Sequence, residues 1–411
     1  MPPGLITEAN DPPETHRGVT LSTQSHSGQV RRRDGVRLRP EPFGALVYVP
    51  DRDHFVALDR KAAHLLDTGD VENRALAAEL VRVGVLDIPS VPEKRFRFGR
   101  ALIGDFPDLP EVTEPLVVNA FATALCPLRC GYCHADDLMQ PFRAGETDDD
   151  VDRVAMTAAA VPAMVAVITG GDPILRPDRT ERLIMALAPE KAIVIDTSGA
   201  GDITPLLPAL KSVQGHLRVS VDSADAAVHD RLRPINPRLL ARGTSSHAAA
   251  WTTIRRAVAA DIATTVQTVV SSANEDRAAL LALARRLAGE GIRQWVLHVA
   301  VPAGRAAEPR SHRLLPSGDV SRLLDDVLAE IDADATLCGL RVRVTATHTS
   351  PNAVLLVGSR GDVYAETGPG GKVRVAAATG DRDTLRRLFQ DRIDRRAHAD
   401  RYLGGTDPQW A

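Results

Sequence analysis

The chain has 411 residues, of which 44% are hydrophobic and 25% are charged, and its formal net charge is −3 at pH 7. This composition is typical of a globular protein and excludes a wholly disordered chain, a collagen-like repeat and a disulfide scaffold. A net charge near zero argues against a global electrostatic attraction to nucleic acid or to an anionic membrane, so no nucleic-acid partner is expected. The length predicts two or three domains.

The N-terminal part of the chain predicts an arm, a small module and a linker. Residues 1–40 are rich in Pro, Ser, Thr and Arg, which is typical of a flexible arm. Residues 41–90 hold two short apolar strands and then two helical patterns, which predicts a small winged-helix-like α+β module. Residues 91–114 contain several prolines and are interpreted as a linker. Within the module we expect strands at 44–50 and 54–59 and helices within 61–66 and 74–87.

Residues 115–305 alternate apolar, β-rich runs with helical patterns. This alternation predicts βαβ units that build a parallel sheet. Six such units would form a partial (β/α)6 TIM-like barrel, whose active site would lie at the carboxyl ends of the strands. Residues 306–411 contain helical and strand patterns and are interpreted as a small C-terminal α+β cap. The six barrel strands are expected at 116–123, 164–169, 192–197, 217–222, 264–270 and 295–301.

A cluster of cysteines follows the first barrel strand. Cys126, Cys130 and Cys133 lie within eight residues of each other, in a chain that has four cysteines. Thiolates on one short loop can converge on one metal centre, and three without a fourth nearby fit an iron–sulfur cluster with one open iron. The alternatives are a Cys3His zinc site completed by His134 and unrelated structural cysteines. Cys338 lies in an apolar stretch and is expected to pack in the interior.

The sequence also bears on the cellular compartment. A secreted disulfide framework would need more cysteines, spread along the chain. The first residues contain no apolar segment of the signal-peptide kind, and no run of the chain reaches membrane-spanning length. We therefore expect a cytoplasmic, reducing environment and no membrane partner.

The C-x3-C-x2-C spacing, with Tyr132 directly before the third cysteine, resembles the radical S-adenosylmethionine (SAM) family. Residues 169–178 are similar to the Gly-Gly-Glu-Pro element of that family, with Asp172 where glutamate is commoner. Residues 220–233 are similar to its fourth-strand signature, and residues 302–306 to the element that ends its sixth strand. The ordered matches cover roughly residues 115–305, so the resemblance implies a radical SAM barrel.

The resemblance also implies a role for each matching residue. Cys126, Cys130 and Cys133 would ligate a [4Fe–4S] cluster whose open iron chelates SAM. Reductive cleavage of SAM would give methionine and a 5′-deoxyadenosyl radical that abstracts a substrate hydrogen, while the protein positions the reactants and excludes water. The other implied SAM contacts are Gly170, Gly171 and Asp172 for the amino group, Ser220 and Asp222 for the ribose or carboxylate, Arg233 or Arg242 for the carboxylate, Ser198 at a further strand end, and Tyr132 near the adenine.

Several of these residues have simpler explanations. Ser220 and Asp222 could cap the end of a strand, and Arg233 could be an ordinary surface arginine. His134, Asp136 and Asp137 lie next to the cysteine loop, where they would either act on the substrate or form a solvated turn.

The flanking regions point to a class of substrate. Residues 41–90 resemble the peptide-recognition domain of maturases of ribosomally made peptides, and a hairpin edge can accept a leader peptide as an added strand. A stabilising cap is the alternative for this module. Residues 306–411 resemble the SPASM/twitch extension of such enzymes without its auxiliary-cluster cysteines, so we expect one cluster.

We therefore expect a radical SAM enzyme of ribosomal-peptide (RiPP) maturation, forming a crosslink, an epimer or a similar product. Its expected partners are a precursor peptide and an electron donor such as flavodoxin or ferredoxin. The alternatives are a radical SAM enzyme acting on a small molecule (a nucleoside, sugar or cofactor precursor) and, less in keeping with the motifs, a non-enzymatic metal-binding protein.

Overall fold

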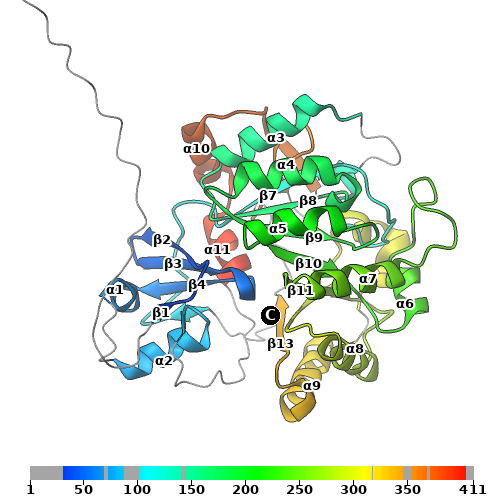
Figure 1. Ribbon diagram of the computed structural model, residues 1–411, viewed down its shortest axis with the longest axis horizontal. Coiled ribbons are helices and arrows are strands. Elements are labelled where there is room, and N and C mark those ends of the chain that lie inside the picture. Colours follow the sequence, from blue (N-terminus) through cyan, green and yellow to red (C-terminus); the bar gives the residue numbers. More distant parts are fainter. Residues whose placement is uncertain are drawn as a thin grey trace, which may run out of the picture.

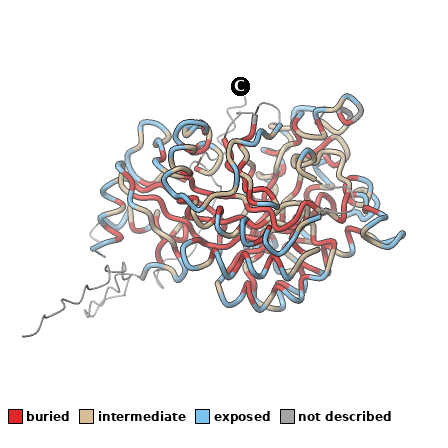
Figure 2. Tube along the Cα trace, turned by 90° about the horizontal axis from the view of Figure 1, so that it is seen from above, coloured by how far each residue is buried: buried red, intermediate tan, exposed pale blue. Residues whose placement is uncertain are grey.

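The computed structural model of the protein describes residues 31–68, 73–87, 101–139, 145–316, 318–345, 353–367 and 371–403. It consists of a small N-terminal module beside a larger α/β body (Figure 1). Buried residues run along the strands through the centre of the body, and exposed residues lie on the surrounding helices and loops (Figure 2). Residues 1–30 of the expected arm and residues 91–100 of the expected linker lie outside the described residues.

The N-terminal module is built on a four-stranded sheet in the order β2-β3-β4-β6. Its predicted hairpin is confirmed, because β3 (Gly44–Val49) pairs antiparallel with β4 (His54–Asp59). The predicted helices are confirmed as α1 (Arg60–Thr68) and α2 (Arg74–Arg82). Apolar side chains of the sheet, such as Val47 and Leu58, pack with Leu65 and Leu80 of these helices in a core separate from that of the larger body.

Residues 31–40 form two strands joined by a turn, so the prediction of a flexible arm is wrong for this part of the chain. β1 (Arg31–Arg32) pairs with β5 (Leu86–Asp87), and β2 (Arg37–Glu41) pairs with β3. The Arg39 guanidinium donates to the carbonyl oxygens of Glu114 and Pro115 at 2.9 and 2.8 Å. This arginine therefore satisfies backbone groups next to the first barrel strand, a distant contact that local composition does not reveal. The expected linker likewise supplies β6 (Leu102–Ile103), which pairs parallel with β4.

The larger body is a ten-stranded sheet in the order β13-β12-β11-β10-β9-β8-β7-β14-β15-β16. Its six central strands are parallel and confirm the predicted barrel strands. Apolar residues on these strands and on the helices between them form one large core. The strands are β7 (Val117–Thr123), β8 (Val165–Gly170), β9 (Ala192–Thr197), β10 (His216–Ser220), β11 (Ala263–Val270) and β12 (Gln294–Val299). The intervening helices are α3 (Asp148–Ala160), α4 (Pro177–Leu187), α5 (Leu207–Ser212), α6 (Ala226–Leu232), α7 (Ser246–Ala259) and α8 (Arg277–Gly289).

The C-terminal region extends this sheet at both edges. β13 (Arg341–Thr345) lies parallel to β12, and β14 (Leu355–Val357) lies parallel to β7. β15 (Val363–Thr367) and β16 (Gly371–Ala376) continue antiparallel from β14. Residues 306–411 therefore build no separate sheet within the described part of the chain. The helices of this region are α9 (Val320–Ala333), α10 (Arg382–Arg392) and α11 (Arg395–Leu403).

The turn between β3 and β4 closes the amino end of the barrel. Its 3-10 helix, Pro50–Arg52, offers the carbonyl oxygens of Pro50 and Asp51 to His216 Nδ1 and Gln294 Nε2, at 2.8 and 3.3 Å. His216 and Gln294 are the first residues of β10 and β12. Since a parallel barrel has its active site at the opposite end, the module supports the floor of the barrel.

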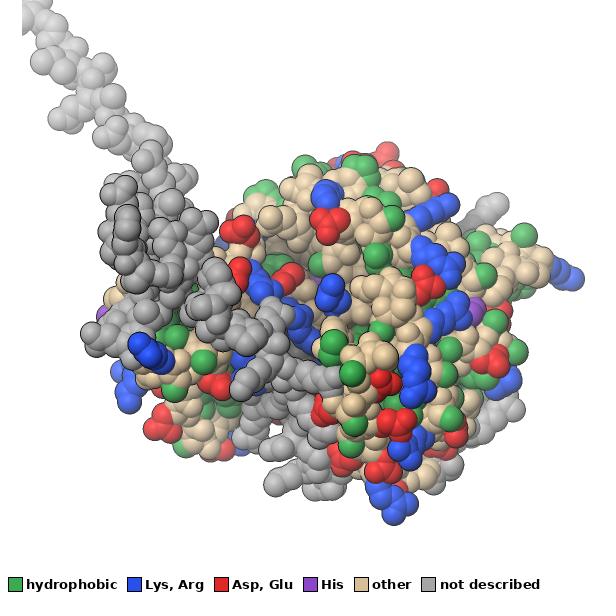
Figure 3. All heavy atoms as spheres, turned by 60° about the horizontal axis from the view of Figure 1, so that its bottom comes forward, with side chains coloured by type: hydrophobic (Ala, Val, Ile, Leu, Met, Phe, Trp, Pro, Cys, Tyr) green, Lys and Arg blue, Asp and Glu red, His purple; other side chains and the backbone are tan. Residues whose placement is uncertain are grey.

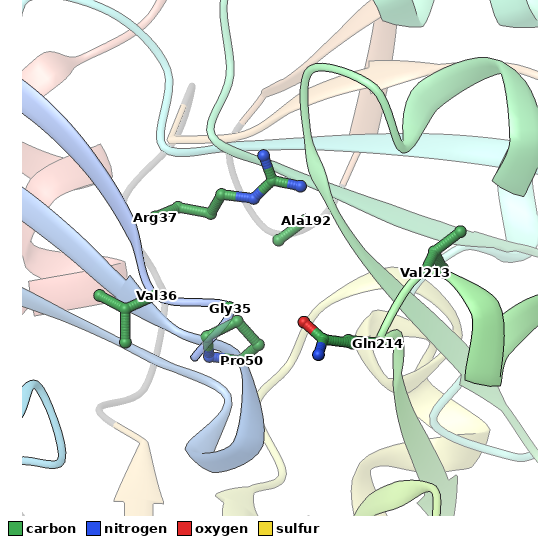
Figure 4. Close-up of a pocket in the computed structure, with 7 residues that line it drawn as sticks. All are labelled: Gly35, Val36, Arg37, Pro50, Ala192, Val213 and Gln214. Carbon is green, nitrogen blue, oxygen red and sulfur yellow. The ribbon is translucent and has the colours of Figure 1, made fainter. Parts of the chain in front are cut away.

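A cavity of ≈ 190 Å³ lies at this junction (Figure 4). The module lines it with Gly35, Val36, Arg37 and Pro50, and the barrel with Ala192, Val213 and Gln214. On the face of the molecule shown in Figure 3, Lys and Arg side chains are interspersed among Asp and Glu. None of the helices in the described part of the chain combines the length and apolar character that a membrane crossing requires.

Two buried histidines make the fold sensitive to acid. Burial lowers the pKa of His54 and of His398 to about 3. The unfolded chain takes up protons on these rings below about pH 6.5, whereas the folded chain takes them up only near pH 3. Stability is therefore fully present above about pH 6.5 and falls as the pH drops below it, by about 1.4 kcal/mol per histidine per pH unit. We expect a lower urea midpoint at pH 5.5 than at pH 7.5.

This prediction can be tested at His398, because a glutamine side chain can make the same two hydrogen bonds there. His398 accepts a hydrogen bond from Leu116 N and donates one to Ala353 O, at 2.9 and 2.7 Å, so a glutamine amide can serve the same two groups. His398→Gln should make the pH dependence shallower by the share of one histidine, whereas the exposed His64→Gln should leave it unchanged. Equal midpoints of the wild type at the two pH values would contradict the prediction.

Candidate active site

The cysteine loop lies at the carboxyl end of β7, as predicted. Cys126, Cys130 and Cys133 are each partly exposed. The start of the loop is held by the segment after α6, because Arg129 N donates to Pro234 O and Asn236 N donates to Pro127 O, at 2.7 and 2.6 Å. The end of the loop is held by the segment after β12. Elements that lie more than a hundred residues apart thus fix both ends.

Gly304 lets the segment after β12 approach the loop closely. Its φ is +55°, and a Cβ atom there would lie 2.4 Å from Cys133 O. Arg305 then donates from its backbone N–H to Cys133 O at 2.9 Å and from Nη1 to Cys130 O at 3.1 Å. Residues 302–306, which resemble a family element, thus pack closely against the cysteine loop and donate hydrogen bonds to it.

The three thiols are kept neutral by their surroundings. Burial raises the pKa of Cys126 well above its ordinary value, and nearby Asp172, Cys130 and Cys133 add to the effect. Burial likewise raises the pKa of Cys130, to about 12, and the pKa of Cys133. Since metal ligation requires thiolates, binding of a metal centre here would release protons.

The donor set fits a cluster better than a single ion. A zinc ion holds its sulfur ligands about 4 Å apart. In the described part of the chain, no three His, Cys, Asp or Glu side chains are arranged to hold one metal ion. A [4Fe–4S] cluster instead spreads three thiolates over three iron atoms. His134, the fourth ligand of the zinc alternative, is 2.6 Å through Nε2 from Glu366 Oε1.

The Gly170–Asp172 element follows β8 and packs directly on the cysteine loop. Gly171 N donates to Thr123 O and Asp172 N donates to Leu125 O, both at 2.7 Å. A Cβ atom on Gly171 would lie 1.7 Å from Leu125 O, and Gly170 has a φ of +127°. In this structure both glycines therefore permit the close contact between the two loops.

The Asp172 carboxylate is buried, and its two oxygens already have partners. Oδ1 accepts from Thr197 Oγ1 at 2.6 Å, and Oδ2 accepts from Ser198 N at 2.9 Å and from the Ser198 hydroxyl. Burial raises the pKa of Asp172. The Thr197–Ser198 strand end predicted as part of a ligand site thus holds Asp172 in place beside Cys126.

The buried residues Asp222 and Arg233 form a second group with the partly exposed Tyr132. Arg233 Nε and Nη2 donate to the two Asp222 oxygens at 2.7 and 3.2 Å, and the Tyr132 hydroxyl also donates to Asp222. Burial alone would raise the pKa of Asp222, but the Arg233 guanidinium holds it below its ordinary value. Arg233 also lies 5.5 Å from the centre of the Tyr132 ring. Arg233 is therefore a buried ion-pair partner, and the alternative of an ordinary surface arginine is wrong.

Three further residues singled out in the sequence, Ser220, Arg242 and Cys338, differ in how exposed they are. Ser220 ends β10 and is partly exposed, opposite Gln267 in the β10–β11 pairing. Arg242 is exposed in the loop before α7. Cys338 is exposed, so the prediction of interior packing is wrong. The short helix Ala335–Leu337 and the residue before β13 bury Leu337 and Leu340 instead, which turns the thiol outward.

His134, Asp136 and Asp137 are tied to distant residues rather than left as a solvated turn. Asp136 pairs with Arg305, and Asp137 Oδ1 is 3.2 Å from Lys372 Nζ. Glu366, on β15, binds both His134 and Arg401, the latter at 3.3 Å. Glu366, Lys372 and Arg401 were not among the predicted residues, and the one local signal that they carry is a charge within a strand or a short helix.

A cavity of ≈ 240 Å³ opens beside the loop at the carboxyl ends of β11 to β13. Its wall is apolar along β12 and polar toward α11, a combination that suits an organic ligand. The residues that line it are Tyr132, His134, Val269, His298, Val299, Ala300, Val301, Ala303, Thr345 and Arg401.

Comparison with known proteins agrees with this geometry. Residues 122–287 match the family model of the radical SAM superfamily. The chain carries a radical SAM domain. The predicted barrel and family resemblance are thereby confirmed, and this family uses a [4Fe–4S] cluster together with SAM.

Curated relatives match less than half of the chain. The chain is 32% identical over 116 residues to the AdoMet-dependent heme synthase of Nitratidesulfovibrio vulgaris, which covers 28% of the chain and 31% of that relative. It is 34% identical over 125 residues to the PqqA peptide cyclase of Methylorubrum extorquens, covering 29% and 32%. With the PqqA peptide cyclase of a Methylobacterium species, 30% identity extends over 186 residues, or 43% and 45%. The matches thus span less than half the length of these relatives.

Solved structures share the fold over more of the chain. SuiB of Streptococcus suis, bound to its precursor peptide SuiA, aligns with a TM-score of 0.56 at 15% identity and covers 88% of each chain. Native anSMEcpe with bound AdoMet aligns with a TM-score of 0.51 at 14% identity, covering 68% of this chain and 81% of that one. The fold of the radical SAM domain and its flanking regions is therefore shared at low sequence identity.

Proposed function

We propose that the protein is a radical SAM enzyme that uses one [4Fe–4S] cluster to modify a ribosomally synthesised peptide. The observation that carries this proposal is the three-thiol loop at the carboxyl end of β7, fixed at both ends by segments that follow α6 and β12. A loop held in this way presents its thiols as a preorganised set.

Cys126, Cys130 and Cys133 would hold the cluster through their thiolates. With SAM bound, a cluster held there would pass on an electron from an external donor for the reductive cleavage of SAM, which gives methionine and a radical able to take a hydrogen atom from the substrate. The residues of the chain would bind and orient SAM and the substrate and exclude water from them. Burial of the loop and the contacts of Arg305 to its carbonyl oxygens serve the exclusion of water.

We propose the following division of the SAM contacts. Gly170 and Gly171 bring the backbone of their loop against Leu125, and Asp172 keeps its carboxylate beside Cys126. Asp222 has its oxygens occupied by Arg233, Tyr132 and Val269 N, so its role is to orient Arg233 and Tyr132. Arg233 would then face the SAM carboxylate and Tyr132 the adenine, while Ser198 and Ser220 line the strand ends between them.

A peptide substrate is supported by two kinds of relative. Several matched relatives are named PqqA peptide cyclase, and SuiB was crystallised with its precursor peptide. The module at residues 41–90 would supply the peptide-recognition surface. Its sheet restricts where an added strand can pair, because β6 occupies the outer edge of β4 and Arg39 of β2 contacts the barrel. A leader peptide would therefore pair outside β6 or replace it.

We further propose that residues 41–90 form the peptide-recognition module, residues 115–305 the catalytic barrel, and residues 306–411 a C-terminal region without an auxiliary cluster. We further infer a cytoplasmic location and an electron donor such as flavodoxin or ferredoxin. A small molecule is the second candidate substrate, which the similarity to an AdoMet-dependent heme synthase favours.

Anaerobic reconstitution tests this proposal. The expected result is about four iron atoms per chain, SAM-dependent formation of 5′-deoxyadenosine with reductant, and a mass change in a candidate precursor peptide. Deuterium at the modified peptide position should appear in 5′-deoxyadenosine. Zinc in place of iron, or no 5′-deoxyadenosine, would overturn the enzyme class. Formation of 5′-deoxyadenosine that peptides never stimulate, but a tetrapyrrole or nucleoside does, would favour the second candidate.

A further inference from the structure

The inward face of the barrel is polar at mid-height, unlike the packed apolar interior of an ordinary parallel barrel. The strand registers place one set of residues on this face. Asp196 lies opposite Arg218, Gln267 opposite Val296, and Val296 opposite Arg343. The polar residues on this face are partly exposed, whereas most of their neighbours along the strands are buried, which indicates that they face an internal space. The polar residues on this face are Asn119, Asp196, Arg218, Gln267, His298 and Arg343.

The module closes the bottom of this space. Arg218 donates through Nε and Nη2 to the two oxygens of Asp53 at 2.6 and 2.7 Å. The hydroxyl of Tyr48 also donates to Asp53, at 2.9 Å. Asp53 and Tyr48 are 3% and 1% exposed, so the floor is sealed by residues that come from outside the barrel.

Asp196 is the residue of this space whose carboxylate is not engaged in the contacts described above. Although it lies opposite Arg218 in the β9–β10 pairing, the Arg218 guanidinium turns to Asp53 in a two-bond pair. No hydrogen bond or ion pair joins the Asp196 carboxylate to another described residue. A carboxylate inside a protein needs a donor or a cation to offset its loss of hydration.

The contacts of its neighbours locate Asp196 along the barrel axis. Arg218, opposite it in the β9–β10 pairing, reaches down to Asp53 at the floor, while Thr197 and Ser198, the next two residues along the chain, bind Asp172 beside the cysteine loop. Asp196 therefore lies between the sealed floor and the proposed SAM site. A substrate side chain that enters the barrel at the carboxyl ends of the strands would pass the proposed SAM site before it reached Asp196.

We propose that Asp196 is a substrate-binding residue that selects a peptide side chain carrying N–H or O–H donors. An ionised carboxylate accepts hydrogen bonds and donates none, so Lys, Asn, Gln, Ser, Thr and Tyr side chains satisfy it, whereas Asp and Glu are repelled. This inference rests on the proposed function, because it names the class of residue that the enzyme acts on.

The test is a binding selection with the reconstituted full-length enzyme in the presence of SAM. The probe is a display library of random 16-residue peptides, selected in parallel on the wild type, on Asp196→Asn and on Asp196→Leu. The matched control is Asp326→Asn, which makes the same change at an exposed position on α9. Formation of 5′-deoxyadenosine without peptide is measured for every variant, so that a loss of SAM cleavage is distinguished from a loss of peptide selection.

The wild type and the control should enrich donor-bearing residues over Asp and Glu, and both Asp196 variants should lose about tenfold of that preference. Because Asn and Asp side chains have the same shape, the result for Asp196→Asn reports the loss of the charge and not a change in packing. Equal preferences in the wild type and Asp196→Asn would overturn the inference and leave the proposed function standing. A wild type that forms 5′-deoxyadenosine yet enriches no peptide would overturn the peptide substrate, and the inference with it.

Discussion

Replacing Cys130 by alanine should abolish the cluster and reduce formation of 5′-deoxyadenosine to background. Three thiolates are the fewest that hold a cluster with one open iron, and the described residues offer no neighbouring fourth cysteine to substitute for a lost one. The same result is expected for Cys126→Ala and Cys133→Ala. The measurements are iron and sulfide per chain after anaerobic reconstitution and 5′-deoxyadenosine after addition of SAM and reductant.

The chain provides its own control for this experiment. Cys338 is exposed and lies outside the loop, so Cys338→Ala should bind the same amount of iron and cleave SAM at the wild-type rate. The variant also removes a thiol that could bind iron adventitiously during reconstitution. Loss of iron in Cys338→Ala, or full SAM cleavage by Cys130→Ala, would contradict the assignment of the three ligands.

The barrel and its cysteine loop were predictable because their signals are local. Each central strand is an apolar run of five to eight residues, such as Ala192–Thr197, with a helical pattern on either side. The three thiols lie in eight consecutive residues, and spacing alone indicates a metal centre. Burial then follows from the fold, since a loop after a barrel strand lies at the carboxyl end of the sheet.

The contacts that shape the site were not predictable, because they join residues far apart in the chain. His134 and Glu366 are 232 residues apart, and Asp53 and Arg218 are 165 apart. A charged residue within a strand indicates a polar contact but not its partner, which depends on strand register and on the docking of the module. The outward turn of Cys338 has a similar origin, since Leu337 and Leu340 compete with it for the interior.

Asp53→Ala should destabilise the protein more than any other single change at the junction of module and barrel. Asp53 is 3% exposed and pairs with Arg218, and its removal would leave the guanidinium in the interior without its counter-charge. Breaking a buried pair in this way costs about 3–5 kcal/mol. Burial alone would raise the pKa of Asp53, but Arg218 holds it well below its usual range, so the pair stays ionised at neutral pH. The loss should therefore be the same at pH 6.5 and pH 8, measured by urea unfolding.

Two further variants separate the charge effect from general disruption. Asp51→Ala alters the same turn at an exposed carboxylate and should change the free energy of unfolding by about 1 kcal/mol or less. Asp53→Ala combined with Arg218→Met removes both charges, so it should recover part of the stability lost in Asp53→Ala alone. Additive losses in the double variant would mean that the two side chains act independently. In that case the module would be held to the barrel by its backbone contacts to His216 and Gln294 rather than by the buried ion pair.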